Sequence, residues 1–201
     1  MDKRSHGFTL IELMITISVM ALLLMVGLPS MNTWLQNQQL RTSAESLQAG
    51  LQFARAEALR RNAPVRFQLV DTLTAACVLA DTGTNWIVSI QDPTGLCDVD
   101  PSDTNAPLAI QKRSGAEGTP NAVVAGTNGA ATANTVTFTG LGRVSGAVAL
   151  PLTRINVSNT NGGACQPAGP MRCLRLDIST AGQVRMCDPA VADNTDPRFC
   201  N

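Results

Sequence analysis

Glu12 is the residue whose position most clearly calls for chemistry. It is the only charged residue in the 21-residue apolar stretch from Phe8 to Leu28. A helix of about 20 apolar residues is long enough to cross a bilayer, and a carboxylate inside it costs roughly 2.5–3.5 kcal/mol on insertion scales. The side chain therefore requires a cationic partner. Gly7 immediately precedes this stretch and Phe8 begins it, so these two residues and Glu12 form one candidate site.

Two simpler interpretations of residues 1–30 are open. An ordinary secretory signal has basic residues and an apolar core, but here the core is too long and no A-x-A cleavage site follows it. A plain single-span anchor requires neither Gly7 before Phe8 nor Glu12 four residues further on. With an anchor, Lys3 and Arg4 hold the short N-terminus in the cytoplasm, so that the rest of the chain faces the other side.

The remaining residue types exclude most catalytic sites. The only histidine is His6, so the chain beyond it has none for Ser-His-Asp or Cys-His catalysis or for binding metals. The glycine-rich segments 126–129 and 140–142 lack the Lys-Ser/Thr of a phosphate loop. We therefore expect no enzymatic activity, no cofactor and no metal. Asp98, Asp100 and Asp103 could bind calcium, but a solvated acidic loop is the favoured interpretation.

Six cysteines follow the apolar stretch, at positions 77, 97, 165, 173, 187 and 200. An even number of cysteines on the far side of a membrane indicates three disulfides, and the absence of C-x-x-C argues against zinc. Six cysteines allow fifteen pairings. The favoured one joins Cys77 to Cys97 around a hairpin and its loop, Cys187 to Cys200 to fasten the tail, and Cys165 to Cys173 as the remaining pair.

The elements that position these residues begin with a long helix. Beyond Pro29, small and apolar residues recur at spacings of three and four: Leu40, Ala44, Leu47, Leu51, Ala54 and Ala58. This stripe predicts an amphipathic helix that ends near Arg61 and Asn62, with Glu57 and Arg61 paired one turn apart. A heptad-like stripe also suits a coiled coil. Because β-rich sequence follows that can cover the stripe, a helix packed on a sheet is favoured.

From residue 65 onward the pattern changes to the two-residue period of β-strands. Strands are expected at Val65–Val70, Ala76–Ala80, Trp86–Ile90, Leu108–Gln111, Thr135–Thr139, Ala147–Leu150 and Arg154–Val157. The first is expected to be half-buried, and the second and third to form a hairpin. Residues 114–134 are rich in Gly, Ala, Thr and Asn and are expected to be the most mobile part.

The last two strands allow a prediction of register. Leu174, Leu176 and Ile178 alternate with polar residues, as do Val184 and Met186. A three-residue loop, 180–182, pairs Ile178 with Val184 and places Asp177 opposite Arg185, whereas a two-residue loop would pair inward with outward residues. Gly182 can take the left-handed conformation that such a loop requires.

These residues carry a family resemblance. A charged leader ending at Gly7, followed by Phe-Thr-Leu-Ile-Glu-Leu and an apolar helix, resembles the type IV prepilins. Leu51–Val65 and Gly182–Pro189 are similar to the GspH/FimT family of minor pilins and pseudopilins. The resemblance implies an α+β pilin fold, with a long N-terminal helix packed on an antiparallel β-sheet domain and stapled by disulfides. Its expected parts are a cleaved leader (1–7), a transmembrane and filament-core helix (8–29), an amphipathic helix (30–62) and a β-rich domain (63–201).

The resemblance also implies how the N-terminus is processed. In this family a membrane peptidase cuts after the residue that matches Gly7 and methylates the new amino group, here that of Phe8. This amino group has an ordinary pKa of roughly 8 and is mostly cationic at neutral pH. Beside Glu12 of a neighbouring subunit, it would neutralise the carboxylate and set the register of assembly.

The implied function is that of a minor pilin of a type IV pilus, helping to initiate assembly at or near the tip. Expected partners are other minor and major pilins, prepilin peptidase and the inner-membrane assembly machinery. The expected location is the inner membrane, with a single span, a cytoplasmic N-terminus and a periplasmic domain, and then the pilus on the cell surface. Two alternatives stay open. One is the H-type minor pseudopilin of a type II secretion system, whose relatives tend to lack cysteines; the other is a DNA-binding pilin for natural DNA uptake.

The DNA alternative depends on the arginines of the C-terminal part. The formal net charge is zero, but residues 143–185 contain five arginines and only one acid, Asp177. Arg172, Arg175 and Arg185 are the candidate DNA contacts, since guanidinium groups suit phosphate. Family members that bind DNA carry Gly-Arg-x-Arg, whereas residues 182–185 here read Gly-Gln-Val-Arg. The competing interpretation is a surface ion pair between Asp177 and Arg185.

Overall fold

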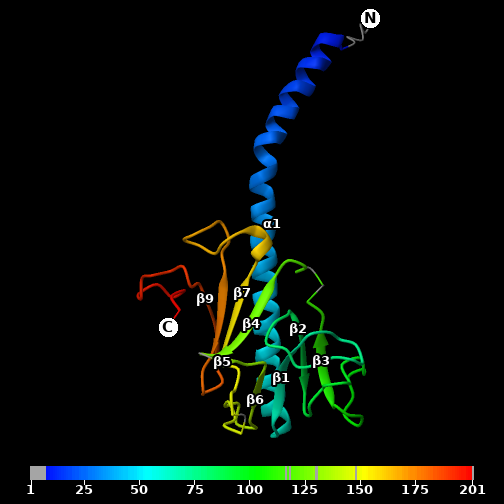
Figure 1. The fold of residues 1–201 in the computed structure, drawn as a ribbon, viewed down its shortest axis with the longest axis vertical. Coiled ribbons are helices and arrows are strands. Elements are labelled where there is room, and N and C mark those ends of the chain that lie inside the picture. The colour runs from blue at the N-terminus through cyan, green and yellow to red at the C-terminus, as the bar shows by residue number, and fades with distance from the viewer. Residues whose placement is uncertain (1–7, 116, 118, 130, 148, 201) are drawn as a thin grey trace, which may run out of the picture. The chain divides into compact units, whose positions relative to one another are not determined.

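The computed structural model describes residues 8–115, 117, 119–129, 131–147 and 149–200, with the side chains of 26–30 left undescribed. The predicted processing residue Gly7 lies outside the described part. The chain divides into two compact units, Met1–Leu35 and Gln36–Asn201. A single helix, α1 (Leu10–Arg61), begins in the first unit and ends in the second (Figure 1).

In its described part, the first unit is the N-terminal half of α1. The helix begins two residues after the expected Phe8, because Thr9 lies at its N-cap. Its large apolar side chains from Leu10 to Met25 are exposed. Within the described part of the chain, no helix has both the length and the hydropathy needed to span a membrane. The predicted span, Phe8–Leu28, extends into residues 26–28, whose side chains lie outside the described ones.

The second unit contains two antiparallel sheets. Sheet A has the order β3-β2-β1-β6, and sheet B has the order β5-β4-β7-β8-β9 (Figure 1). The strands of sheet A are β1 (Val65–Val70), β2 (Asn85–Ser89), β3 (Ala109–Arg113) and β6 (Thr135–Phe138). Those of sheet B are β4 (Val123–Asn128), β5 (Ala131–Thr132), β7 (Arg154–Ser158), β8 (Leu174–Ile178) and β9 (Val184–Cys187).

The predicted stripe of α1 forms the centre of the core. Its six members are each at most 1% exposed: Leu40, Ala44, Leu47, Leu51, Ala54 and Ala58. They share one cluster with Phe67 and Trp86 of sheet A and with Ile155 and Leu176 of sheet B. A Cβ at Gly50 would lie 2.9 Å from both the Phe67 and Trp86 rings, so glycine lets these rings pack against the helix. The prediction of a helix packed on antiparallel sheet is confirmed.

The first strand is more buried than its alternating sequence suggests. Five of the six residues of β1 are buried, including the polar Gln68, which accepts a hydrogen bond from Ser89 Oγ at 3.0 Å. A second, smaller cluster contains Val70, Cys77, Ile87, Cys97 and Ala109. It forms because the chain between β1 and β2 and the chain between β2 and β3 meet at the Cys77–Cys97 disulfide and cover the adjoining strands.

The predicted hairpin of Ala76–Ala80 with Trp86–Ile90 is wrong. β2 pairs with β1 and β3, and from the first segment only Leu79 makes a single bridge, with Val70. The carboxylate of Asp71 explains the difference, because it accepts hydrogen bonds from the N–H groups of both Thr72 and Val78. The segment is thereby closed into a turn.

Two further expectations differ from the structure. Residues 114–134 contain β4 and β5, although their composition suggested a mobile loop. Gly126 is required in β4 because a Cβ at this position would meet the Ala133 carbonyl and Leu152. In contrast, the described residues of Ala147–Leu150 form no strand.

The register of β8 and β9 follows the sequence prediction. Ile178 pairs with Val184, Leu176 with Met186 and Asp177 with Arg185. Gly182 has φ +78°, the left-handed conformation that was expected in the connecting loop.

Candidate assembly site and charged surfaces

The start of α1 is a capping box formed by Thr9 and Glu12. Glu12 N–H donates to Thr9 Oγ1 at 3.3 Å, while Thr9 N–H and Oγ1 donate to Glu12 Oε2 at 3.4 and 3.3 Å. Such a box satisfies backbone donors that a helix N-terminus leaves free. These bonds are longer than the usual 2.9–3.0 Å. The carboxylate is thus exposed and bound to Thr9, the residue after Phe8, which is itself 84% exposed.

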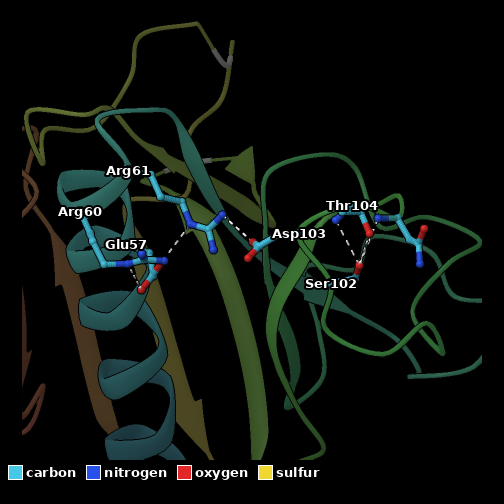
Figure 2. A network of polar contacts seen from close by, with 7 residues as sticks. Glu57, Arg60, Arg61, Ser102, Asp103 and Thr104 are labelled. Atoms are coloured by element: carbon cyan, nitrogen blue, oxygen red, sulfur yellow. Dashed lines mark hydrogen bonds and ion pairs between the residues drawn. The ribbon is translucent and has the colours of Figure 1, made fainter.

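The end of α1 carries a network of four charged side chains (Figure 2). Glu57 binds Arg60 at 2.7 Å and Arg61 at 2.9 Å, and Arg61 also binds Asp103 at 2.7 Å. The predicted pair of Glu57 and Arg61 is present. Asp103 could not be predicted as a partner of Arg61, because it lies in the connection between β2 and β3. The network fastens that connection to the helix.

Hydrogen bonds from Arg60, and then those from Arg61, lower the pKa of Glu57 below its ordinary range, against the opposing effect of burial. A lowered folded-state pKa contributes stability at pH values above the unfolded pKa, about 4.3, and this contribution is lost as the pH falls through the folded pKa. We therefore expect Glu57→Gln to flatten the loss of unfolding free energy on acidification below about pH 4.3. Urea unfolding at pH values from neutral to 3 measures this. Glu45→Gln, which removes a carboxylate from the exposed Arg41 pair, is the control, and an unchanged acid profile in Glu57→Gln would contradict the prediction.

The acidic loop considered for calcium already contains a cation. Lys112 Nζ donates to the carbonyl oxygens of Cys97, Asp98 and Val99 at 3.3, 2.8 and 3.1 Å. Its distance to Asp100 Oδ1 is 3.9 Å, and Asp103 is held by Arg61. An ammonium group therefore lies where carbonyl and carboxylate oxygens would otherwise converge on a metal ion.

We expect Lys112→Met to lower the unfolding free energy by about 1.5–3 kcal/mol, the range for hydrogen bonds to a charged group. Chemical unfolding followed by the fluorescence of buried Trp86 measures this. Arg113→Met, which removes an exposed cation from the next position of β3, is the matched control and should change little. Calcium should not raise the melting temperature of the unmodified chain, and a rise would show that the loop binds metal despite Lys112.

The three candidate DNA contacts do not form a set of unengaged arginines. Arg175 binds Asp177, which also binds Arg154, at 3.1 and 3.3 Å respectively. Arg185 instead donates through Nη2 to the carbonyls of Pro197 and Phe199. Asp177 and Arg185 are opposite in register, but the expected ion pair between them is wrong. Asp177 binds Arg154 and Arg175, and Arg185 binds backbone carbonyls of the tail. Arg172 is exposed.

The structure has three disulfides, Cys77–Cys97, Cys165–Cys173 and Cys187–Cys200, the same pairs that the sequence favours. The last one fastens the tail, which Arg185 also holds. Asp177, Cys187 and Cys200 come within 4.8 Å of one another, but both cysteines are oxidised to the disulfide and provide no thiolate for a metal. In the tail, the side-chain hydrogen bond from Arg198 lowers the pKa of Asp196 to about 2.

A helix with a prepilin-type start, packed on antiparallel sheets, defines the class of prepilin-like proteins. The model of the prokaryotic N-terminal methylation motif matches residues 2–28, which implies a processed prepilin-type anchor in the inner membrane. The model of the type II transport protein GspH matches residues 43–194. This match covers more than half of the chain, and the chain belongs to the GspH family. Members of pilin and pseudopilin families are structural proteins that interact with other pilins or pseudopilins.

Two solved structures resemble the chain, both of the type IV minor pilin FimU of Pseudomonas aeruginosa. One is 16% identical, covers 73% of this chain and 90% of its own, and has a TM-score of 0.47. The other is 16% identical, covers 74% and 88%, and has a TM-score of 0.46. No curated protein sequence matches the chain.

Proposed function

We propose that this chain is a minor pilin of a type IV pilus, which helps to initiate pilus assembly and lies at or near the tip. The observation that carries the proposal is the combination, in one chain, of a methylation motif at residues 2–28 and a GspH-family domain at 43–194. α1 (Leu10–Arg61) runs from the first into the second. The role is structural, and neither enzymatic activity nor a cofactor is part of it.

The proposal assigns a task to each part of the chain. Prepilin peptidase removes residues 1–7 by cutting after Gly7 and methylates Phe8. Residues 8–29 anchor the subunit in the inner membrane and later lie in the filament core, while 30–62 and 63–201 form the periplasmic domain. Glu12 sets the register against the amino terminus of a neighbouring pilin. The inner-membrane assembly machinery then moves the subunit into a pilus on the cell surface.

The test separates the pilus from the secretion system. Deletion of the gene should reduce surface pili and leave type II secretion unchanged, and the full-length chain should restore the pili and be found in sheared pilus fractions. A normal number of pili together with a loss of secretion would instead identify an H-type pseudopilin. Three disulfides argue against that alternative, since its relatives tend to lack cysteines.

DNA binding is not favoured as the main function. Two of the three arginines expected at a DNA contact hold other groups of the protein, Asp177 for Arg175 and the tail for Arg185. A gel shift with the full chain, repeated after changing Arg172, Arg175 and Arg185 to Gln, tests it directly. Salt-sensitive binding that these changes abolish would restore the DNA alternative.

A further inference from the structure

A groove lies between the last turns of α1 and the loop that joins β8 to β9. One wall is formed by Gln52, Ala56 and Leu59, which follow one face of the helix. The other wall is formed by Gly182, Gln183 and Val184. Neither the assembly site nor the charged network at the end of α1 uses this groove.

Hydrogen bonds fix the shape of the groove. Arg55 Nε donates to the Gly142 carbonyl at 3.0 Å, and Val144 N–H donates to the Thr180 carbonyl at 3.1 Å. Gly182 lies so close to the Gly142 carbonyl that a Cβ would collide with it. The turn around Gly142 and the β8–β9 loop are therefore locked together. A partner that binds here loses little free energy in ordering the site.

Apolar side chains are exposed at the groove. Leu59 is 49% exposed on the helix wall, and Leu141, beside Gly142, is 78% exposed. A Cβ at Gly142 would lie 3.2 Å from Leu59, so the two leucines belong to neighbouring segments. Leu59 lines the groove together with Ala56 and Val184, whereas Leu141 lies outside its lining, so the apolar contact that the groove offers centres on Leu59.

One side of the groove is also the start of an edge strand. The tail covers the far end of this edge, where Asp188 N–H donates to the Arg198 carbonyl and Asp188 bridges Phe199. β9 is the last strand of sheet B. Ser179 N–H bonds to the Gln183 carbonyl, and Asp177 pairs with Arg185, so the odd-numbered residues of β9 face β8. In an antiparallel ladder, the N–H and C=O groups of Val184 and Met186 then point away from β8. An extended segment can bind these groups by strand addition.

The charges beside the groove end of this edge are positive, whereas the acids Asp188 and Asp196 lie at the end that the tail covers, where Asp196 is paired with Arg198. Arg143, next to Gly142, and Arg185, within β9, are both exposed, and Arg55 lies in the groove wall. The hydrogen bonds of Arg185 to the tail go to neutral carbonyl groups, so its charge is not neutralised there. The complementary segment is acidic.

We propose that this groove binds an extended acidic segment of a neighbouring pilin, which adds to the edge of β9 at Val184, before the part that the tail covers, and places an apolar side chain against Leu59. The identity of the partner rests on the proposed function, whereas the groove and the chemistry of its occupant do not. The exposed Gln183 lies within the groove, which makes it suitable for a photoreactive amino acid.

The experiment uses the full chain in its own cells, with the photoreactive residue at 183. The expected product is a cross-link to an acidic, non-helical segment of another pilin. Leu59→Glu should lower its yield at least about 5-fold. Val78→Glu is the matched control. Val78 is also 49% exposed, and its replacement adds the same charge at a position outside the groove. The control should leave the yield unchanged.

Cross-links to a second copy of this chain, to a helix or to DNA, or an unchanged yield in Leu59→Glu, would overturn the inference. So would the absence of a cross-link from chains found in sheared pili. A Leu59-dependent cross-link to an acidic segment of a secretion pseudopilin would support the groove and its occupant but contradict the proposed function. Failure of the groove inference and failure of the proposed function therefore give different results.

Discussion

Glu12→Ala is expected to lower the amount of this chain in sheared pili about 100-fold or more, while its amount in the inner membrane stays the same. Removing one partner of a buried ion pair costs about 3–5 kcal/mol, because the other charge remains unpaired. In the proposed register, that other charge would be the amino group of Phe8 on a neighbouring subunit. Insertion should not suffer, since alanine removes the only charge of the apolar stretch. Immunoblots of membranes and sheared pili measure both quantities.

Thr9→Ala is the control for this prediction. Glu12 also closes the capping box with Thr9, so the loss of Glu12 weakens the start of α1 as well as any pairing between subunits. Thr9→Ala loses the cap, at about 0.5–2 kcal/mol, but keeps the carboxylate. Near-normal incorporation of Thr9→Ala is therefore expected. If both variants fail equally, the cap is the cause, and if Glu12→Ala is incorporated normally, the proposed register is wrong.

Replacing both Cys77 and Cys97 by Ala is expected to lower the unfolding free energy by about 3 kcal/mol. The disulfide spans 20 residues, and both cysteines are 1% exposed in the smaller core. Their loss frees the unfolded chain and also leaves apolar space beside Val70 and Ile87. Chemical unfolding of the full chain in detergent, without reductant, measures the change.

The paired alanine variant of Cys165 and Cys173 is the comparison. That disulfide spans only 8 residues, and Cys165 is exposed, so a smaller loss is expected. Reductant should bring the unmodified chain close to the variant that lacks all six cysteines. Equal stability of the Cys77/Cys97 variant and the unmodified chain would show that the smaller core holds without its disulfide.

Periodicity was sufficient to predict the elements that face a single core. The stripe from Leu40 to Ala58 repeats with the period of a helix, and its members are buried. The β8–β9 register followed from alternation, because a slip of one residue would turn Ile178 outward. In both cases one face of the element is buried, so apolar residues recur in the sequence with the period of that element.

The sequence predicted less where contacts join distant segments. Asp103 with Arg61, and Lys112 with the carbonyls of 97–99, depend on how two loops fold back, which no spacing encodes. Ala76–Ala80 has the composition of a strand, but the Asp71 carboxylate accepts a hydrogen bond from Val78 N–H and closes the segment into a turn. β4 was not predicted because Gly126 and its small neighbours have a low β-propensity. Glycine is present there because the strand passes very close to the Ala133 carbonyl.

The candidate site shows the same division. Gly7, Phe8 and Glu12 could be predicted from the sequence because they lie within one short motif, in the residues 2–28 that match the methylation motif, and their roles stay a prediction. The role of Arg185 could not, because its partners, Pro197 and Phe199, contribute only backbone carbonyls. A carbonyl group is present at every residue, so it leaves no mark in the sequence.

The three disulfides close segments of 20, 8 and 13 residues, and none of them includes α1. The covalent cross-links therefore join loops to one another and the end of β9 to the tail, and none of them reaches α1. A pulling force on α1 is resisted by noncovalent contacts, among them the packing of Leu40, Leu47 and Leu51, the hydrogen bond from Arg55 to Gly142 and the ion pair of Arg61 with Asp103. A force that separates α1 from the sheets would therefore break noncovalent contacts and leave all three disulfides intact.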